Sequence, residues 1–242
     1  MRTNNRTLML RCPTCNAEND SYALICTNCR GYLQNRVPNL DLFETVWGVV
    51  ESPPGTFRRI ALAEHKNYSF VLFTGLGVAI MFTLFWLHRF GNVIDSIPGL
   101  LGAGLAAGIV VGPILGFVLP GVAHLVLTLS GVKVRFRNSL AALAYAVSPV
   151  VSSVVVILPI ELALFGMYLF TSNPSPYALK PVAYVMLIGF DSLLALWSVL
   201  LGVVGLKVVH QTSWARAAIA VVAVLGVLAA LGWASSMVPW AW

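Results

Sequence analysis

The stretch "GLLGAGLAAGIVVGPILGFVLPGVAHLVLTL" (residues 99–129) contains no Asp, Glu, Lys or Arg. A bilayer core about 30 Å thick is crossed by roughly 20 apolar residues in a helix, so this stretch is long enough to span a membrane. Two crossings would need roughly 40 residues, which favours one tilted helix over a hairpin. Its prolines, Pro113 and Pro120, can kink that helix, and its glycines, most of them at 99–108, are spaced to let a second helix approach closely.

Four further segments reach spanning length, at about residues 68–88, 139–170, 181–206 and 215–240. The segment at 139–170 contains Pro149 and Pro159 and poses the same choice between one kinked helix and a hairpin. In the whole chain 58% of residues are hydrophobic and 10% are charged, against roughly 45–50% and about 25% in soluble domains. The sequence therefore predicts an all-α polytopic membrane protein with five transmembrane helices.

The basic residues of the loops indicate how these helices are oriented. Cytoplasmic loops collect Lys and Arg, and thirteen of the fifteen basic residues fall on one side if each segment crosses once. This predicts a multi-pass protein of the cell (inner or plasma) membrane, with the N-terminus in the cytoplasm and the C-terminus outside. Hairpins in both long segments would give the same loop assignment. The topology also explains the net charge of +6 without a nucleic-acid partner.

Residues 37–66 form a juxtamembrane segment ahead of the first span. Apolar residues recur at helical spacing in its first part, at Phe43, Val46, Trp47 and Val50. The sequence "SPPG" then ends this helix, and a second one begins with Arg58 and Arg59 near its start. Two arrangements are open: helices lying in the cytoplasmic interface with Arg near lipid phosphates, or an ordinary helix pair packed under the bundle.

All four cysteines of the chain lie in "RCPTCNAENDSYALICTNCRGYL" (residues 11–33), as two Cys-x₂-Cys pairs. Two such pairs can complete a tetrahedral zinc site, and four thiolate ligands leave no open position for water, so the site would be structural. A segment of roughly 20 residues cannot bury a core of its own, which makes the metal its source of stability. Disulfides are disfavoured in the cytoplasm, and an iron–sulfur cluster fits this spacing less well. We expect structural Zn²⁺ held by Cys12, Cys15, Cys26 and Cys29.

The sequence thus divides into a zinc ribbon at 1–36, the juxtamembrane helices at 37–66 and a five-span domain at 67–242. Within the ribbon, four apolar side chains are expected to pack internally: Tyr22, Leu24, Ile25 and Tyr32. The remaining ribbon surface mixes acidic and basic residues, so nucleic acid is not an expected partner.

Three ionisable residues lie within the predicted spans: His124, Glu161 and Asp191. Such groups are costly in a bilayer and are candidates for function, with Asp191 as a carrier of protons or cations. Counting residues along each helix places the three side chains at different depths in the membrane. We therefore expect each of them to make a separate helix contact rather than to share a metal or proton site. Ser148 and the pair Ser152 and Ser153 are expected to bond back to their own helix.

Two segments of the membrane region carry a resemblance to a known family: "GVAHLVLTLSGVKVRFRNSLAALAYAVSPVVSSVVVILP" and "LLALWSVLLGVVGLKVVHQTSWARAAIAVV". With "SPPGTFRRI" ahead of the first span, they resemble prokaryotic members of the Yip-domain (Ypt/Rab-GTPase-interacting) family over about residues 50–240. In eukaryotes the family implies binding of prenylated small GTPases in vesicle traffic, but the eukaryotic Asp-Leu-Tyr-Gly-Pro motif is absent here. The family supplies no agreed catalytic residues. "CPTCNAEN…CTNCRGYL" is similar to the short zinc ribbon that begins many bacterial and archaeal membrane proteins.

These observations favour a non-enzymatic membrane protein that organises the membrane or recruits partners in a docking or trafficking-like role. The expected partners are the lipid bilayer and a cytoplasmic or membrane protein, and a second copy of the chain is compatible with the spans. The alternative is a transporter or channel for a small solute, ion or lipid that uses Asp191 and Glu161. We find no internal inverted repeat of the kind that transporters usually show.

Overall fold

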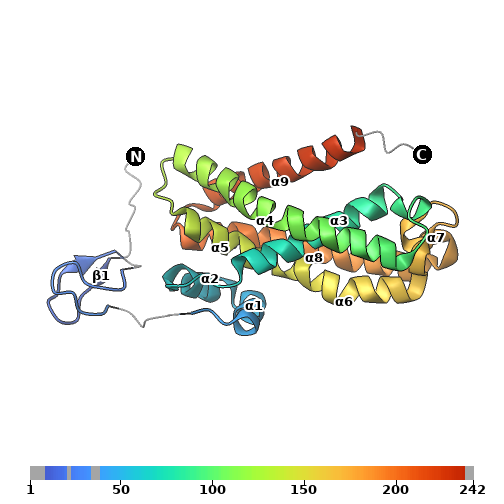
Figure 1. The fold of residues 1–242 in the computed structure, drawn as a ribbon. Coiled ribbons are helices and arrows are strands. Elements are labelled where there is room, and N and C mark those ends of the chain that lie inside the picture. The colour runs from blue at the N-terminus through green and yellow to red at the C-terminus, as the bar shows by residue number, and fades with distance from the viewer. Residues whose placement is uncertain (1–8, 21–22, 34–38, 238–242) are drawn as a thin grey trace.

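The computed structural model describes residues 9–20, 23–33 and 39–237. A small N-terminal part lies beside an elongated helical bundle (Figure 1). In the small part, strands β1 (Leu10–Arg11) and β2 (Glu18–Asn19) pair in antiparallel fashion. The helices that follow are α1 (Leu42–Glu51), α2 (Pro53–Leu62), α3 (Ser69–Leu87), α4 (Ile97–Leu129), α5 (Phe136–Ala146), α6 (Ser148–Phe165), α7 (Pro176–Leu179), α8 (Pro181–Val209) and α9 (Trp214–Met237), with short 3-10 turns η1 (Phe90–Asn92) and η2 (Gly166–Phe170).

Five helical segments are long and apolar enough to cross a membrane, which confirms the predicted number of spans: Ser69–Leu87, Ile97–Leu129, Phe136–Phe170, Pro181–Val209 and Trp214–Met237. Helix α4 continues through both of its internal prolines as a single helix, so it is no hairpin. The third span begins at Phe136, before the predicted residue 139, and is not one continuous helix because α5 ends at Ala146 and α6 begins at Ser148. The end of the last predicted span, 238–240, lies outside the described residues.

The interruption of the third span follows from Pro149, which has no backbone N–H to donate to the carbonyl of Tyr145. The hydroxyl of Ser148 donates to that carbonyl instead, at 2.7 Å. Ser152 donates to the carbonyl of Ser148 at 2.9 Å, so the expected back-bonded hydroxyls are confirmed at these two positions. The buried Tyr145 hydroxyl in turn donates to the carbonyl of Asn67 at 3.0 Å, which ties α5 to the residues just before α3.

The long helices close into a ring in which α3 packs against α4, α4 against α9, α9 against α8, α8 against α6, and α6 against α3. Helix α5 is enclosed at one end of this ring, where it packs against α3, α4 and α8. The small side chains of its "AALAYA" sequence fit this crowded position, and residues 141–146 are all buried. The enclosed α5 fills one end of the bundle interior.

Helices α1 and α2 lie at the α5 end of the bundle (Figure 1). Phe57 and Ile60 of α2 have no exposed surface, and α2 packs against α8 and α5. Helix α1 instead leaves Phe43 83% exposed and Trp47 70% exposed. Each of the two predicted arrangements therefore describes one helix: α2 packs under the bundle, and α1 keeps the exposed apolar face that interfacial helices have.

An ion pair between Glu44 and Arg59 joins α1 to α2, with Arg59 Nη2 donating to Glu44 Oε2 at 3.1 Å. Hydrogen bonding from this guanidinium lowers the pKa of Glu44, so the carboxylate is charged at neutral pH. Both groups are exposed, and such a pair orients the helices more than it stabilises them.

Helices α3 and α4 meet at the distance of backbone contact. A Cβ atom on Gly108 would lie 2.5 Å from Val78 Cα, and one on Gly112 would lie 2.4 Å from Thr74 Cα. Both distances are far below a normal contact, so only glycine permits this packing. The predicted close approach through glycines is confirmed, and it extends beyond residues 99–108 to Gly112. We call this contact the glycine seam.

We predict that Gly112→Ala destabilises the bundle by about 1–3 kcal/mol, because the added methyl group forces α3 and α4 apart. Gly102 on the same helix meets nothing within 4 Å, so Gly102→Ala is the matched control and should leave stability unchanged or slightly raised. Thermal unfolding of both variants in the same detergent measures the difference. Equal melting temperatures for the two variants would show that the seam does not limit packing.

Candidate functional site: a cysteine cluster and a carboxylate pocket

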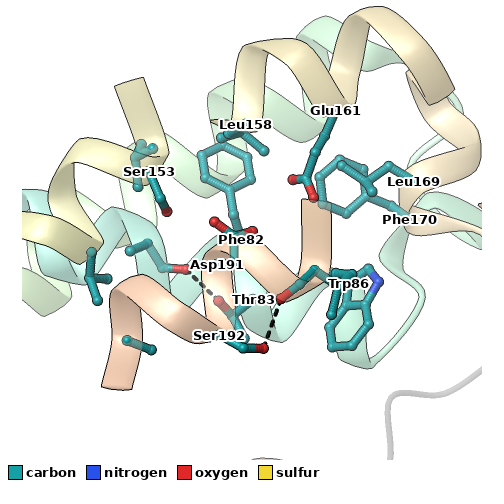
Figure 2. A pocket seen from close by; sticks show the side chains of 15 residues that line it. Phe82, Thr83, Trp86, Ser153, Leu158, Glu161, Leu169, Phe170, Asp191 and Ser192 are labelled. Carbon is teal, nitrogen blue, oxygen red and sulfur yellow. Dashed lines mark hydrogen bonds between the residues drawn. The ribbon is translucent and has the colours of Figure 1, made fainter. Parts of the chain in front are cut away.

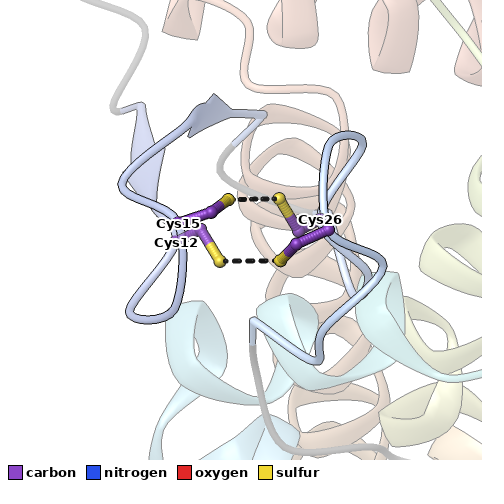
Figure 3. Close-up of side chains that lie close together, drawn as sticks. Cys12, Cys15 and Cys26 are labelled. Carbon is purple, nitrogen blue, oxygen red and sulfur yellow. Dashed lines mark hydrogen bonds between the residues drawn. The ribbon is translucent and has the colours of Figure 1, made fainter.

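Each Cys-x₂-Cys pair occupies the same kind of tight turn. The N–H of Asn16 donates to the carbonyl of Cys12 at 2.9 Å, and the N–H of Arg30 donates to the carbonyl of Cys26 at 3.0 Å. Asn16 and Arg30 both adopt positive φ, 58° and 57°. The two turns face one another and bring the four sulfur atoms together (Figure 3).

The four Sγ atoms lie within 4.8 Å of one another and form no disulfide. The pairs Cys12–Cys29 and Cys15–Cys26 are each separated by 3.5 Å. A tetrahedron with Zn–S bonds of 2.3 Å needs sulfur atoms about 3.8 Å apart, so the cluster is close to that geometry. Hydrogen bonding from the backbone of Cys29 lowers the pKa of Cys26 to about 6. The cluster can hold a metal ion.

Asn19, which the sequence did not single out, connects the two turns. It is 3% exposed, and its Oδ1 accepts hydrogen bonds from Thr27 N at 2.9 Å and Thr27 Oγ1 at 3.1 Å. Its Nδ2 donates to the carbonyl of Ala17 at 2.8 Å and approaches Cys26 Sγ at 3.5 Å. The amide thus holds one cysteine turn against the other and donates to the sulfur of Cys26.

The apolar side chains of this N-terminal part do not all pack as expected. Ile25 and Tyr32 face each other in an antiparallel bridge, yet they are 49% and 63% exposed. The prediction that these two side chains pack internally is therefore wrong, because the cysteines and Asn19 occupy the interior. Leu24 is partly buried, and Tyr22 lies outside the described residues.

The second candidate site is a cavity of about 310 Å³ lined by α3, α6, η2 and α8, and it extends from Val150, near the end of α5, to Trp86 and Phe170. Glu161 of α6 and Asp191 of α8 both line it, and Figure 2 shows their side chains reaching into it from opposite sides. The expectation that these residues would make separate helix contacts is therefore wrong. Because α6 packs against α8, the two positions meet, although counting along each helix had placed them at different depths.

The two carboxyl groups of this pocket have few hydrogen-bond partners within the protein. Glu161 is 6% exposed and has no hydrogen-bond or ion-pair partner among the described residues. Asp191 Oδ1 is buried without a hydrogen bond, while Ser153 interacts with the same carboxyl group. A buried acid without a partner, such as Glu161, is costly in a bilayer, and ionisable groups of this kind are candidates for binding sites.

His124 does not belong to this pocket. It lies at the α5 end, with its ring 6.1 Å from that of Phe136, and its buried Nδ1 has no hydrogen bond. The nearby His210, just beyond α8, shares a 2.9 Å hydrogen bond with Ser139. Burial, with a contribution from His124, lowers the pKa of His210 to about 4, so this histidine is neutral at physiological pH. Because His210 is neutral and hydrogen-bonded to Ser139, we interpret it as a helix-packing residue rather than as a binding-site residue.

We predict that Asn19→Ala weakens metal binding by about 10–100-fold, because orienting partners of ligand residues contribute on that scale. Competition with a zinc chelator of known affinity measures the change in the purified protein. Asn28→Ala is the matched control, since the exposed Asn28 contributes only its backbone N–H to Cys26. An Asn19→Ala protein that competes as well as Asn28→Ala would contradict the orienting role.

Comparison with known protein families gives a match over most of the chain. No curated protein and no solved structure shows a significant match. The model of the family described as "Yip1 domain" matches residues 47–236, which include α2, the first four spans and all but the last residue of the fifth. This match covers most of the chain, and the chain therefore belongs to the Yip1 domain family.

Proposed function

We propose that this protein is a non-enzymatic membrane protein that recruits a protein partner through its N-terminal zinc-stabilised module. The observation that carries the proposal is the exposed pair Ile25 and Tyr32, an apolar patch on a module with little interior of its own. An exposed aromatic beside an aliphatic side chain is typical of interface anchors. The five spans then serve as the membrane anchor of this docking surface.

Zinc is the metal that this proposal assigns to the cysteine cluster. Four sulfur ligands in near-tetrahedral arrangement favour zinc, and they leave no position where a substrate or water could bind the ion. A ligand-saturated site supports a structural and not a catalytic role. The same proposal places the module in the cytoplasm, where basic residues of the loops concentrate.

We predict that replacing both Ile25 and Tyr32 by Ser removes the cytoplasmic proteins that co-purify with the chain, as does deletion of residues 1–36. Zinc content and membrane insertion should be unchanged in the double variant, because neither side chain ligates metal or enters the bundle. Quantitative mass spectrometry of cross-linked material compares the partners. Phe43→Ser, on exposed α1, is the control for general loss of surface hydrophobicity. An unchanged partner profile in the double variant would refute docking through this patch.

A second candidate function, transport of a small solute, is favoured by the convergence of Glu161 and Asp191 in one pocket. A further apolar cavity of about 170 Å³ adjoins it, because Val150 and Ala195 line both. Together the two cavities extend from the carboxylates toward the enclosed α5, as a path between two sides of a membrane would.

We predict for this candidate that Asp191→Asn abolishes cation uptake into proteoliposomes, because the substitution removes a charge that a moving cation would need. Uptake of Na⁺ and H⁺ can be followed with trapped indicator dyes. Asp95→Asn, an exposed acid outside the pocket, is the control and should transport like the wild type. Equal flux in the wild type and Asp191→Asn argues against transport through this pocket.

A further inference from the structure

The carboxylate pocket presents hydrogen-bond acceptors and no free donor among its described polar groups. The hydroxyl of Thr83 donates to the carbonyl of Ala79 at 2.9 Å, and that of Ser192 donates to the carbonyl of Ile188 at 2.7 Å. The hydroxyl of Ser153 is hydrogen-bonded to the carboxyl group of Asp191. Trp86 Nε1 donates to Tyr184 Oη at 3.1 Å. These donors are committed to the protein itself, and what remains for a ligand is carboxylate and hydroxyl oxygen.

Apolar and aromatic side chains surround these hydrogen-bond acceptors. Phe82, Trp86 and Phe170 line the cavity beside the carboxylates. Its volume of about 310 Å³ lies at the small end of ligand sites, which suits a molecule of one ring or a short chain. Aromatic faces add attraction for a cation, so the frame and the acids favour the same kind of ligand.

A ligand that satisfies this site must carry positive charge and N–H donors at one end. Glu161 is more than nine-tenths buried, has no partner among the described residues and is aimed into the cavity (Figure 2). Arg89 lies over the Trp86 ring, with its Cζ 5.6 Å from the ring centroid, and does not line the pocket. Among the described residues, no Lys, Arg or His lines the cavity.

We propose that this pocket binds a small primary ammonium compound with an apolar body, its ammonium group held between Glu161 and Asp191 and its body against Phe82 and Trp86. An ammonium has three donors and no acceptor, which complements a lining made only of acceptors. This inference deepens the second candidate function by naming a ligand class. It concerns binding alone and requires no movement across the membrane.

Calorimetric titration of the full-length protein in detergent with 2-phenylethylamine tests the proposal. The wild type should bind the protonated amine, and both Glu161→Gln and Asp191→Asn should bind it at least about tenfold more weakly, because each loses one charge-assisted hydrogen bond. Asp95→Asn is the matched control and should bind like the wild type. An amide group has nearly the same shape as a carboxyl group, so neither substitution should disturb the packing. Melting curves show whether each variant is folded.

Two further measurements distinguish an amine from other classes of ligand. The neutral analogue 2-phenylethanol should not compete with the amine, and competition at similar affinity would show a protonated, uncharged pocket and overturn the proposal. Binding of Na⁺ without binding of the amine, or equal amine affinity in all variants, would also overturn it. A protein that binds the amine but moves no cation in proteoliposomes refutes the transport candidate and leaves this inference standing.

Discussion

In hydrocarbon no water can complete a broken backbone hydrogen bond, so each interruption of a spanning helix must be repaired by the protein. The third span shows this at Pro149, where the hydroxyl of Ser148 bonds the carbonyl that proline leaves free. The backbone bonds from Val147 N to the carbonyl of Leu143 and from Val151 N to the carbonyl of Val147 remain, so α6 follows directly on α5. Helix α5 packs against α3, α4 and α8 and closes one end of the bundle, and α6 beyond it lines the carboxylate pocket.

The spans were predictable because hydropathy and the length of a bilayer crossing largely decide them. The clustering of the four cysteines was equally predictable, since the spacing of each Cys-x₂-Cys pair is local. The prolines of the third span predicted a kink, but not that one helix would end and another begin at Val147, since α4 stays continuous through Pro113 and Pro120. What distinguishes the third span is that its N-terminal part is buried among other helices, and burial of that kind is a tertiary property.

The convergence of Glu161 and Asp191 could not be read from their positions along the chain. Whether two such residues meet depends on which helices are neighbours in the ring and on how each helix is rotated, and neither follows from one sequence. Asn19 was missed for a different reason. An amide near a turn usually serves the turn, and only its location between two cysteine pairs, at the end of a short strand, could have suggested a link between them.

The glycine seam has a consequence for motion. Side chains that interdigitate can slip past each other by changing rotamers, but α3 and α4 touch through their backbones and have no such freedom. They therefore behave as one rigid plate, which forms the α3 wall of the pocket. Any change in the shape of the pocket would therefore come from α6 and α8 rather than from the α3 wall.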